Sequence, residues 1–235
     1  MDIRKAPDPQ ALARQAAAYI AERIATVLTQ RESCHLALAG GNTPRATYAL
    51  LREMDLPWSR LHFWFGDERC LPAGDAQRND TMVKEALLAG SPPPPAQLHG
   101  ISAELGPEVA AQQYTQALSR IERLDIVLLG LGEDGHTASL FPDNPALAMQ
   151  SRAVPVHHAP KPPSQRVSLS MNSIRDAGER IVIAAGEDKR EALTRILAGE
   201  KLPAATIGAA TWFLDEAAIA DLCDNAVLQK QRKSE

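Results

Sequence analysis

LDIVLLGLGEDGHTASLFP, residues 124–142, joins a fully apolar run to a loop rich in glycines and polar side chains. The run at residues 126–129 is short, continuous and without polar alternation, which is typical of a strand buried on both faces of a parallel sheet. The loop that follows therefore leaves the carboxyl end of a parallel strand. Open α/β sheets bind their ligands in the crevice at that edge, so we expect the functional site to include this loop.

Asp134 and His136 are the residues of this loop that can carry chemistry. The imidazole of a histidine can take a proton from water near neutral pH, and a neighbouring carboxylate can fix its tautomer and stabilise the imidazolium. A tight turn, with the aspartate as a helix cap and the histidine merely exposed, would use the same residues without chemistry. Because the two groups alternate within one short loop at a strand end, we interpret them as catalytic.

The composition describes an ordinary globular protein. Of the 235 residues, 45% are hydrophobic and 23% are charged, so the length allows one large domain or two small ones. The formal net charge of -4 and the isoelectric point near 5.9 argue against a nucleic-acid or membrane-surface partner, which would call for a basic patch. An anionic ligand must therefore be bound by local features of the site.

Cysteine usage and hydropathy predict a cytoplasmic protein. The three cysteines are scattered without paired spacing, which indicates reduced thiols rather than a disulfide framework or a zinc site, and no metal is expected. We find no signal-peptide pattern and no apolar run of membrane-spanning length. The sequence does not specify the oligomeric state, and a monomer is compatible with it.

Apolar strands and amphipathic helices alternate along the chain, which predicts an α/β fold with a mostly parallel sheet and helices on both faces. We expect a single domain over residues 1–235 that begins with a helix at residues 9–31 and ends in a frayed tail at about residues 225–235. The alternation of polar and apolar residues at 166–170 predicts a strand with one wet face. The other strands are expected at residues 34–39, 61–65, 126–129, 181–185 and 211–214.

The turn Gly40-Gly41-Asn42-Thr43, after the first of these strands, is a candidate phosphate site. Its glycines let backbone N–H groups approach a ligand, and the N-terminus of the following helix favours negative charge. We expect Thr43 to be the helix N-cap, with Pro44 at the first helical position. The turn lacks the Gly-Lys-Ser/Thr ending of a nucleotide-binding loop and the spacing of a dinucleotide site, so a plain strand-to-helix connection is the alternative.

Charged residues follow two further strands. Asp67, Glu68 and Arg69 come shortly after the strand at residues 61–65, and Lys189 lies in the first turn of a predicted helix. Because a helix N-terminus disfavours a cation, an anion shared with the helix would explain Lys189. The alternatives are a solvated ion cluster and a lysine that turns into solvent. The segment at residues 155–163 is expected to be irregular, with three surface residues: His157, His158 and Lys161.

The chain carries three motifs in the following order: Gly40-Gly41-Asn42-Thr43-Pro44, then Gly66-Asp67-Glu68-Arg69 with Asn79 downstream, then GEDGHTASLFP at residues 132–142. Their order and spacing resemble the 6-phosphogluconolactonase family over about residues 18–214, and DGHTASLFP is the most specific string. The resemblance implies a Rossmann-like fold shared with glucosamine-6-phosphate deaminases. It also implies a cytosolic enzyme of the oxidative pentose phosphate pathway that needs no organic cofactor and hydrolyses 6-phosphoglucono-1,5-lactone to 6-phosphogluconate.

This chemistry gives each candidate residue a role. A lactone is an activated ester, so water would attack C1 with His136 as the general base and Asp134 as its orienting partner. Arg69 or loop N–H groups would stabilise the oxyanion that forms. The candidate substrate-binding and phosphate-binding residues are Gly40, Gly41, Asn42, Thr43, Asp67, Asn79, Arg166 and Lys189.

Three positions depart from the family pattern. Ala39 stands where many relatives have serine, and Ser168 and Ser170 stand where threonines are common. None of these changes removes a charge or a backbone donor. We therefore expect them to affect fine substrate contacts rather than the activity itself.

Two other functional classes are compatible with parts of the sequence. A glucosamine-6-phosphate deaminase or sugar-phosphate isomerase would use the same cradle, with the Asp-x-His pair for ring opening and proton transfer. Arg69 and the continuation at residues 137–142 follow the lactonase pattern instead. A non-catalytic sugar-phosphate sensor is the third class, and the presence of both His136 and Asp134 argues against it. No G-x-S-x-G elbow occurs, so a serine nucleophile is not expected.

Overall fold

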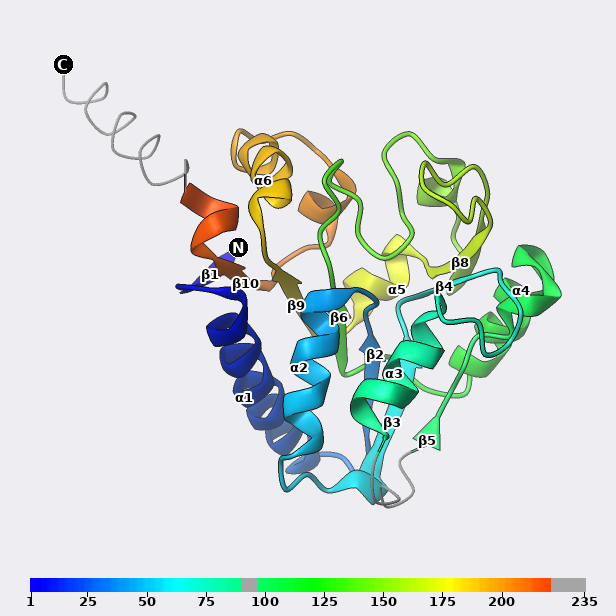
Figure 1. Ribbon diagram of the computed structural model, residues 1–235. Coiled ribbons are helices and arrows are strands. Elements are labelled where there is room, and N and C mark those ends of the chain that lie inside the picture. Colours follow the sequence, from blue (N-terminus) through cyan, green and yellow to red (C-terminus); the bar gives the residue numbers. More distant parts are fainter. Residues whose placement is uncertain (90–96, 221–235) are drawn as a thin grey trace.

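Parallel strands form the central sheet of the computed structural model, which describes residues 1–89 and 97–220 (Figure 1). The described part of this sheet has seven strands in the order β1-β10-β9-β6-β2-β3-β5, and every neighbouring pair is parallel. The tail at residues 225–235, expected to be frayed, lies outside the described residues. The strands are β1 (Asp2–Ala6), β2 (Cys34–Leu38), β3 (Leu61–Phe65), β5 (Gln97–Leu98), β6 (Ile126–Leu129), β9 (Glu179–Ala184) and β10 (Thr211–Asp215).

Helices cover both faces of this sheet, as predicted. The chain moves from β2 through β3 to β5 in one direction along the sheet, and from β6 through β9 to β10 in the other. Right-handed crossovers then place α1 (Pro9–Leu28), α2 (Asn42–Arg52) and α3 (Asn79–Leu87) on one face, where Figure 1 shows them in front of the strands. α4 (Pro107–Leu118), α5 (Met171–Asp176) and α6 (Arg190–Leu197) lie on the other face, and residues 216–220, after β10, are also helical.

The change of direction fixes where a ligand can bind. β2 and β6 are neighbours in the middle of the sheet, and their connections leave toward opposite sides. A crevice therefore opens between the loops at their carboxyl ends, which is the ligand-binding position of open α/β sheets. All four residues of β6 are buried, as its apolar sequence predicts, so the loop at residues 130–137 starts from a rigid strand.

Two buried tyrosines hold the strand ends at this crevice. The hydroxyl of Tyr48 on α2 accepts from the N–H of Ala39 (2.8 Å) and donates to its carbonyl (2.9 Å). The hydroxyl of Tyr114 on α4 makes the same pair of bonds with Phe65, at 2.7 and 3.1 Å. Both phenols thus satisfy backbone groups that have no water to bind. Helices on the two faces of the sheet thereby fix the points at which β2 and β3 end.

A second, smaller sheet was not predicted. It consists of β4 (Asp67–Arg69), β8 (Arg166–Leu169) and β7 (Ala153–Val156), and its neighbouring pairs are antiparallel. Pro155, expected in an irregular segment, lies within β7. The prediction of one wet face for residues 166–170 is wrong, because every residue of β8 is buried. Ser168 is buried on the face expected to be wet, and its hydroxyl accepts from the N–H of Ser139 (3.2 Å).

Two predictions near the N-terminus are also corrected. The chain begins with β1, which pairs with β10 at the edge of the large sheet, rather than with a helix. α2 begins at Asn42 with Gly41 as its N-cap, so Thr43 is not the cap and Pro44 is not the first helical residue. Gly41 has φ 103°, a left-handed conformation that glycine adopts without strain, and it turns the chain into the helix two residues earlier than expected.

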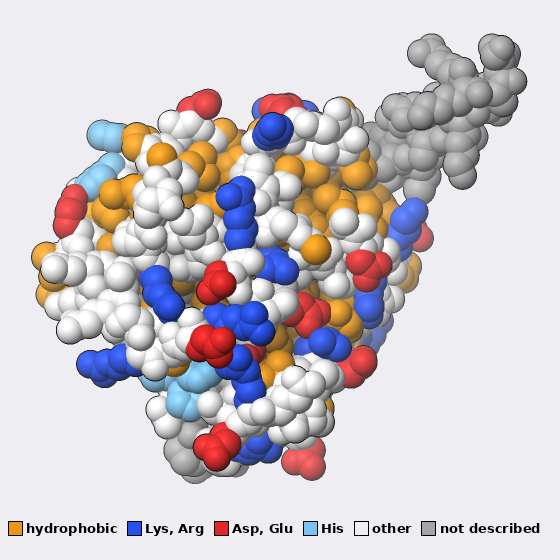
Figure 2. Space-filling view, turned by 180° about the vertical axis from the view of Figure 1, so that it is seen from behind, with side chains coloured by type: hydrophobic (Ala, Val, Ile, Leu, Met, Phe, Trp, Pro, Cys, Tyr) orange, Lys and Arg blue, Asp and Glu red, His pale blue; other side chains and the backbone are white. Residues whose placement is uncertain are grey.

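The surface carries charges of both signs, and the cysteines in the described residues are free thiols. Figure 2 shows Lys and Arg side chains down the middle of the face opposite to that of Figure 1, with Asp and Glu side chains beside them. Within residues 1–89 and 97–220, no helix is both long enough and apolar enough to cross a bilayer. Cys34 is a buried free thiol and Cys70 a partly buried one.

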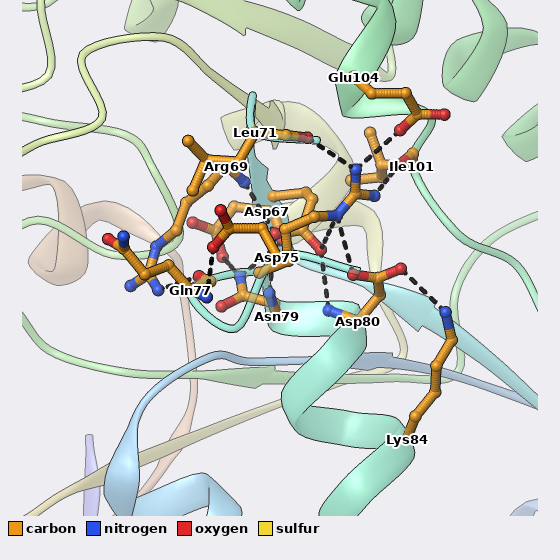
Figure 3. A network of polar contacts seen from close by, with 12 residues as sticks. Asp67, Arg69, Leu71, Asp75, Gln77, Asn79, Asp80, Lys84, Ile101 and Glu104 are labelled. Atoms are coloured by element: carbon orange, nitrogen blue, oxygen red, sulfur yellow. Dashed lines mark hydrogen bonds and ion pairs between the residues drawn. The ribbon is translucent and has the colours of Figure 1, made fainter. Parts of the chain in front are cut away.

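Glu68 caps the N-terminus of α3 from the neighbouring β4. Its Oε1 accepts from the N–H groups of Arg69 and Asn79 and its Oε2 from the N–H of Asp80, each at 2.8 Å (Figure 3 labels these three partners). Burial raises the pKa of Glu68 to about 7, although these three bonds favour its charged form. The carboxylate satisfies N–H groups that a helix leaves without partners at its start. It thereby joins the small sheet to α3.

We expect Glu68→Ala to lower the free energy of unfolding by about 3 kcal/mol or more, because each buried N–H left without an acceptor costs ~1–3 kcal/mol. Urea denaturation measures the change. Glu85→Ala is the matched control, since Glu85 lies on the same helix in an exposed ion pair with Arg45. Equal effects of the two substitutions would show that the buried carboxylate is not a structural cap.

Candidate active site

A cavity of about 220 Å³ lies at the carboxyl ends of β2, β3 and β6. This is below the ~300–1,000 Å³ of pockets for drug-sized molecules, so the site suits a small ligand. Asn42 and Thr43 do not line it, because the early start of α2 places them in the first helical turn. Asp134 lies behind His136 rather than in the wall. The predicted residues that line the cavity are Gly40, Gly41, Asp67, Arg69, Asn79, His136, Arg166 and Lys189.

Asp134 and His136 form a hydrogen-bonded pair. Asp134 Oδ1 lies 2.5 Å from His136 Nδ1 and also accepts from the backbone N–H of His136 at 3.0 Å. Burial opposes the charge of Asp134, but these hydrogen bonds outweigh it and lower the pKa of the carboxyl to about 2. An ionised carboxylate can only accept, so Nδ1 carries the proton in the neutral ring. Nε2 is then the nitrogen that can take a proton from a bound molecule.

Gly132 and Phe141 hold the imidazole from two sides. A Cβ atom at Gly132 would lie 2.0 Å from His136 Nδ1, so the ring packs directly on the glycine backbone. The ring centroid of Phe141 lies 4.5 Å from that of His136. The N–H of Gly132 also donates to the carbonyl of His136 at 2.9 Å, which closes the loop into a tight turn. The glycine of the motif is therefore a steric requirement of the pair.

Asp67 and Asn79 form a second polar group in the cavity wall (Figure 3). Asn79 Nδ2 donates to Oδ1 of Asp67 at 3.1 Å and to its carbonyl at 2.9 Å, and Ser139 Oγ donates to Asp67 Oδ2 at 2.6 Å. A Cβ at Gly40 would lie 2.1 Å from Asn79 Oδ1, so the amide packs directly on that glycine. These bonds join the turn after β2, the strand β4 and the loop at residues 130–142 into one wall.

Four cations line the cavity, and all have partners in the protein. Arg69 donates to the carbonyl of Gln77, and Arg166 is bound to backbone carbonyls. Lys189, in the N-cap position of α6, pairs with Asp188 (Nζ to Oδ2, 2.7 Å). The fourth cation is Lys161. The four cations outnumber the three wall carboxylates, Asp67, Glu133 and Asp188, so the net charge of the lining is positive and suits an anionic ligand.

Lys161 was predicted to be a surface residue, and it is exposed, but it also lines the cavity. Sequence reasoning missed this because the residue lies in an irregular loop between β7 and β8, without a strand end or periodicity to mark it. Its Nζ lies 2.7 Å from Oε1 of Glu133, a second wall residue that was not predicted. Among the described residues no group of three or more His, Cys, Asp or Glu side chains could hold a metal ion.

These features together suit a reaction in which a proton is taken from water beside an anionic ligand. A family described as glucosamine-6-phosphate isomerases/6-phosphogluconolactonase matches residues 7–214. The chain belongs to this family.

Relatives within the family match over most of their length. A 6-phosphogluconolactonase of Streptomyces coelicolor is 38% identical, with 92% of each chain covered, and one of Rattus norvegicus is 35% identical, with 89% of each covered. The structure of a 6-phosphogluconolactonase from Thermotoga maritima has a TM-score of 0.84 at 27% identity, covering 91% of this chain and 99% of that one. A monomeric glucosamine-6-phosphate deaminase, at 20% identity and TM-score 0.78, shares the fold.

The departures from the family pattern have local explanations in the structure. Ser170 is the N-cap of α5, where its hydroxyl accepts from the N–H of Ser173. Ser168 bonds the backbone of the catalytic loop at Ser139. Ala39 is bonded through its backbone to Tyr48, which a change of side chain leaves intact.

We expect Gly132→Ala to separate His136 from Asp134, because the added methyl group would occupy the space of the imidazole. The Nδ1–H proton of His136, shifted far downfield in a short hydrogen bond to a carboxylate, should be seen by proton NMR in the wild type and lost in the variant. Gly130→Ala is the matched control in the same loop, since a Cβ there meets nothing within 4 Å. A resonance that persists in Gly132→Ala would contradict this account of the glycine.

Proposed function

We propose that the protein hydrolyses 6-phospho-D-glucono-1,5-lactone to 6-phospho-D-gluconate, the second step of the oxidative pentose phosphate pathway, in the cytosol. The observation that carries the proposal is the Asp134–His136 pair in a cavity lined by cations. Relatives named as 6-phosphogluconolactonases, similar over nine-tenths of the chain, support a lactone hydrolase. The ligand would be the sugar-phosphate lactone, with no nucleic acid, membrane or organic cofactor involved.

In the proposed complex the phosphate occupies the cationic side of the cavity. Gly40 and Gly41 line the cavity, and the space beside Gly41, where a Cβ would lie 3.9 Å from Pro44 Cδ, lets phosphate oxygens approach the backbone. Asn42 and Thr43, in the first turn of α2, add the partial positive charge of the helix N-terminus. Lys189 supplies a charge-assisted contact. Arg166 is already bonded to two backbone carbonyls, so it can contribute its charge and its remaining N–H groups.

The chemistry then follows from the orientation of the imidazole. Nε2 of His136 takes a proton from water while the water oxygen attacks C1 of the lactone, and the carbonyl oxygen becomes an oxyanion. Asp134, ionised because its pKa is about 2, stabilises the imidazolium. Arg69 or backbone N–H groups of the loop stabilise the oxyanion. When the C1–O5 bond breaks, the imidazolium returns the proton to the ring oxygen, which becomes the 5-hydroxyl group, and the histidine is again neutral.

The deaminase alternative would use the same cavity for a different reaction. Its support is the family description, which covers both activities, and a shared fold at 20% identity, which carries no argument about substrate. The lactonase relatives are more similar, at 35–38% identity over nearly the whole chain. The lactonase is therefore the better-supported function, and the substrates themselves provide the test.

We expect the purified protein to accelerate hydrolysis of fresh 6-phosphogluconolactone and to release no ammonia from glucosamine 6-phosphate. His136→Asn should lower kcat for the lactone ~10²–10⁴-fold, as typical for a lost general base, while the fold survives. The spontaneous opening of the lactone must be subtracted from every rate. His157→Asn is the matched control, because His157 also pairs with a carboxylate (Nε2 to Glu108 Oε1, 2.7 Å) but lies outside the cavity.

Release of ammonia without hydrolysis of the lactone would contradict the proposed lactonase activity and support deaminase activity instead. A His136→Asn variant that turns over as fast as His157→Asn would instead remove the histidine from the mechanism and leave the activity in place. The two results concern different parts of the proposal and can be distinguished.

A further inference from the structure

Arg166 holds the loop that carries Lys161 at the mouth of the cavity. Arg166 is 7% exposed, and its guanidinium donates from Nη2 to the carbonyl of Lys161 (2.9 Å) and from Nε to that of Pro163 (3.2 Å). Its Cζ also lies 5.5 Å from the ring centroid of Phe141, which packs on His136. A buried cation with several partners is a fixed point of the structure. The backbone of Lys161 therefore has a defined position relative to the site.

The side chain of Lys161 has more freedom than its backbone. It is 62% exposed, and its one ion pair is with Glu133, which is 53% exposed. Exposed pairs of this kind contribute little to stability, because water screens the charges and two long side chains lose freedom. Exchanging Glu133 for another anion therefore costs the protein little.

Lys189 also pairs with a carboxylate of the wall, since Asp188 lies 2.7 Å from its ammonium, although its side chain is only 21% exposed. Each lysine thus has a singly charged carboxylate from the protein as its partner. A phosphoryl group that carries up to two negative charges and three acceptor oxygens is the stronger partner for both. The two carboxylates also balance the charge of the two lysines in the cavity wall.

We propose that Lys161 is a further substrate-specificity residue. When substrate binds, Lys161 breaks its ion pair with Glu133 and contacts the phosphoryl group instead. Glu133 therefore competes with the substrate for the lysine. The inference rests on the proposed function for the identity of the substrate. It goes beyond the predicted cradle of the glycine turn, Arg166 and Lys189, because it adds a cation from a different loop and an internal competitor. It also predicts opposite changes in substrate affinity when Lys161 and Glu133 are replaced.

The test measures KM for 6-phosphogluconolactone, in which the phosphoryl group is the sole anion, and Kd for 6-phosphogluconate by titration calorimetry. Lys161→Ala should raise both constants roughly fivefold or more while kcat changes less than twofold, as for a contact made equally in ground and transition states. Glu133→Gln should lower both constants, because the lysine is then free for the ligand. The double variant should have the same KM and Kd as Lys161→Ala, because Glu133 affects binding only through the ammonium of Lys161.

Lys84→Ala is the matched control, because Lys84 is an exposed lysine in an ion pair with Asp80 outside the cavity. The inference is overturned if Lys161→Ala behaves like Lys84→Ala, or if Glu133→Gln raises the constants as Lys161→Ala does, which would indicate a purely structural pair. Wild-type protein that binds 6-phosphogluconate through Lys161 but does not hydrolyse the lactone would contradict the proposed function alone. Hydrolysis that is insensitive to Lys161 would contradict this inference alone.

Discussion

The hydrogen bond between Asp134 and His136 is the interaction on which the rest of the site depends. The distance between Oδ1 and Nδ1 is 2.5 Å, so the bond places the proton of the neutral ring on Nδ1 and leaves Nε2 able to accept a proton. The bond needs a loop tight enough to bring residues two apart into contact and a space for the ring. Gly132 supplies the space, because no side chain larger than a hydrogen atom fits against the imidazole.

The fold supplies the fixed frame that so short a loop requires. β6 is buried throughout and delivers the loop at the point where the sheet changes direction. Tyr48 and Tyr114 fix the ends of the neighbouring strands, and Glu68 fixes the start of α3, which carries Asn79 into the wall. Buried polar groups with all their partners in place are rigid. The elements around the cavity are thus held by hydrogen bonds between backbone and buried side chains, while the exposed side chain of Lys161 keeps its freedom.

The sequence predicts the centre of this arrangement better than its edges. Strands such as β6 are found because burial on both faces leaves an unbroken apolar run, and the loop chemistry follows directly from its position. β1 and β4 escape prediction because they are short edge elements whose partners, β10 and β8, lie far away in the sequence. The burial of β8 escapes as well, since its polar residues are satisfied by tertiary contacts such as that of Ser168 with Ser139.

The site residues that the sequence predicts also differ from those it misses in how the fold positions them. Those at strand ends are found from the local pattern, whereas Lys161 reaches the cavity only because Arg166 binds its loop across the structure. Asn42 and Thr43 belong to a correctly located turn, but a shift of two residues in the start of α2 takes them out of the wall. Positions set by a helix start or by a long-range hydrogen bond cannot be read from spacing alone.

The pH dependence of kcat/KM for unphosphorylated glucono-1,5-lactone tests the central claim most directly, because this substrate has no phosphate to titrate in the same range. Asp134, with a pKa of about 2, stays ionised at mildly acidic pH and cannot cause a loss of rate there. If a neutral imidazole is the base, kcat/KM should fall toward acidic pH as the imidazole takes a proton, and the fall should persist in Glu68→Gln, because Glu68, with a pKa of about 7, also titrates in the neutral range. A catalysed rate that stays constant between about pH 5 and about pH 8 would contradict a histidine base.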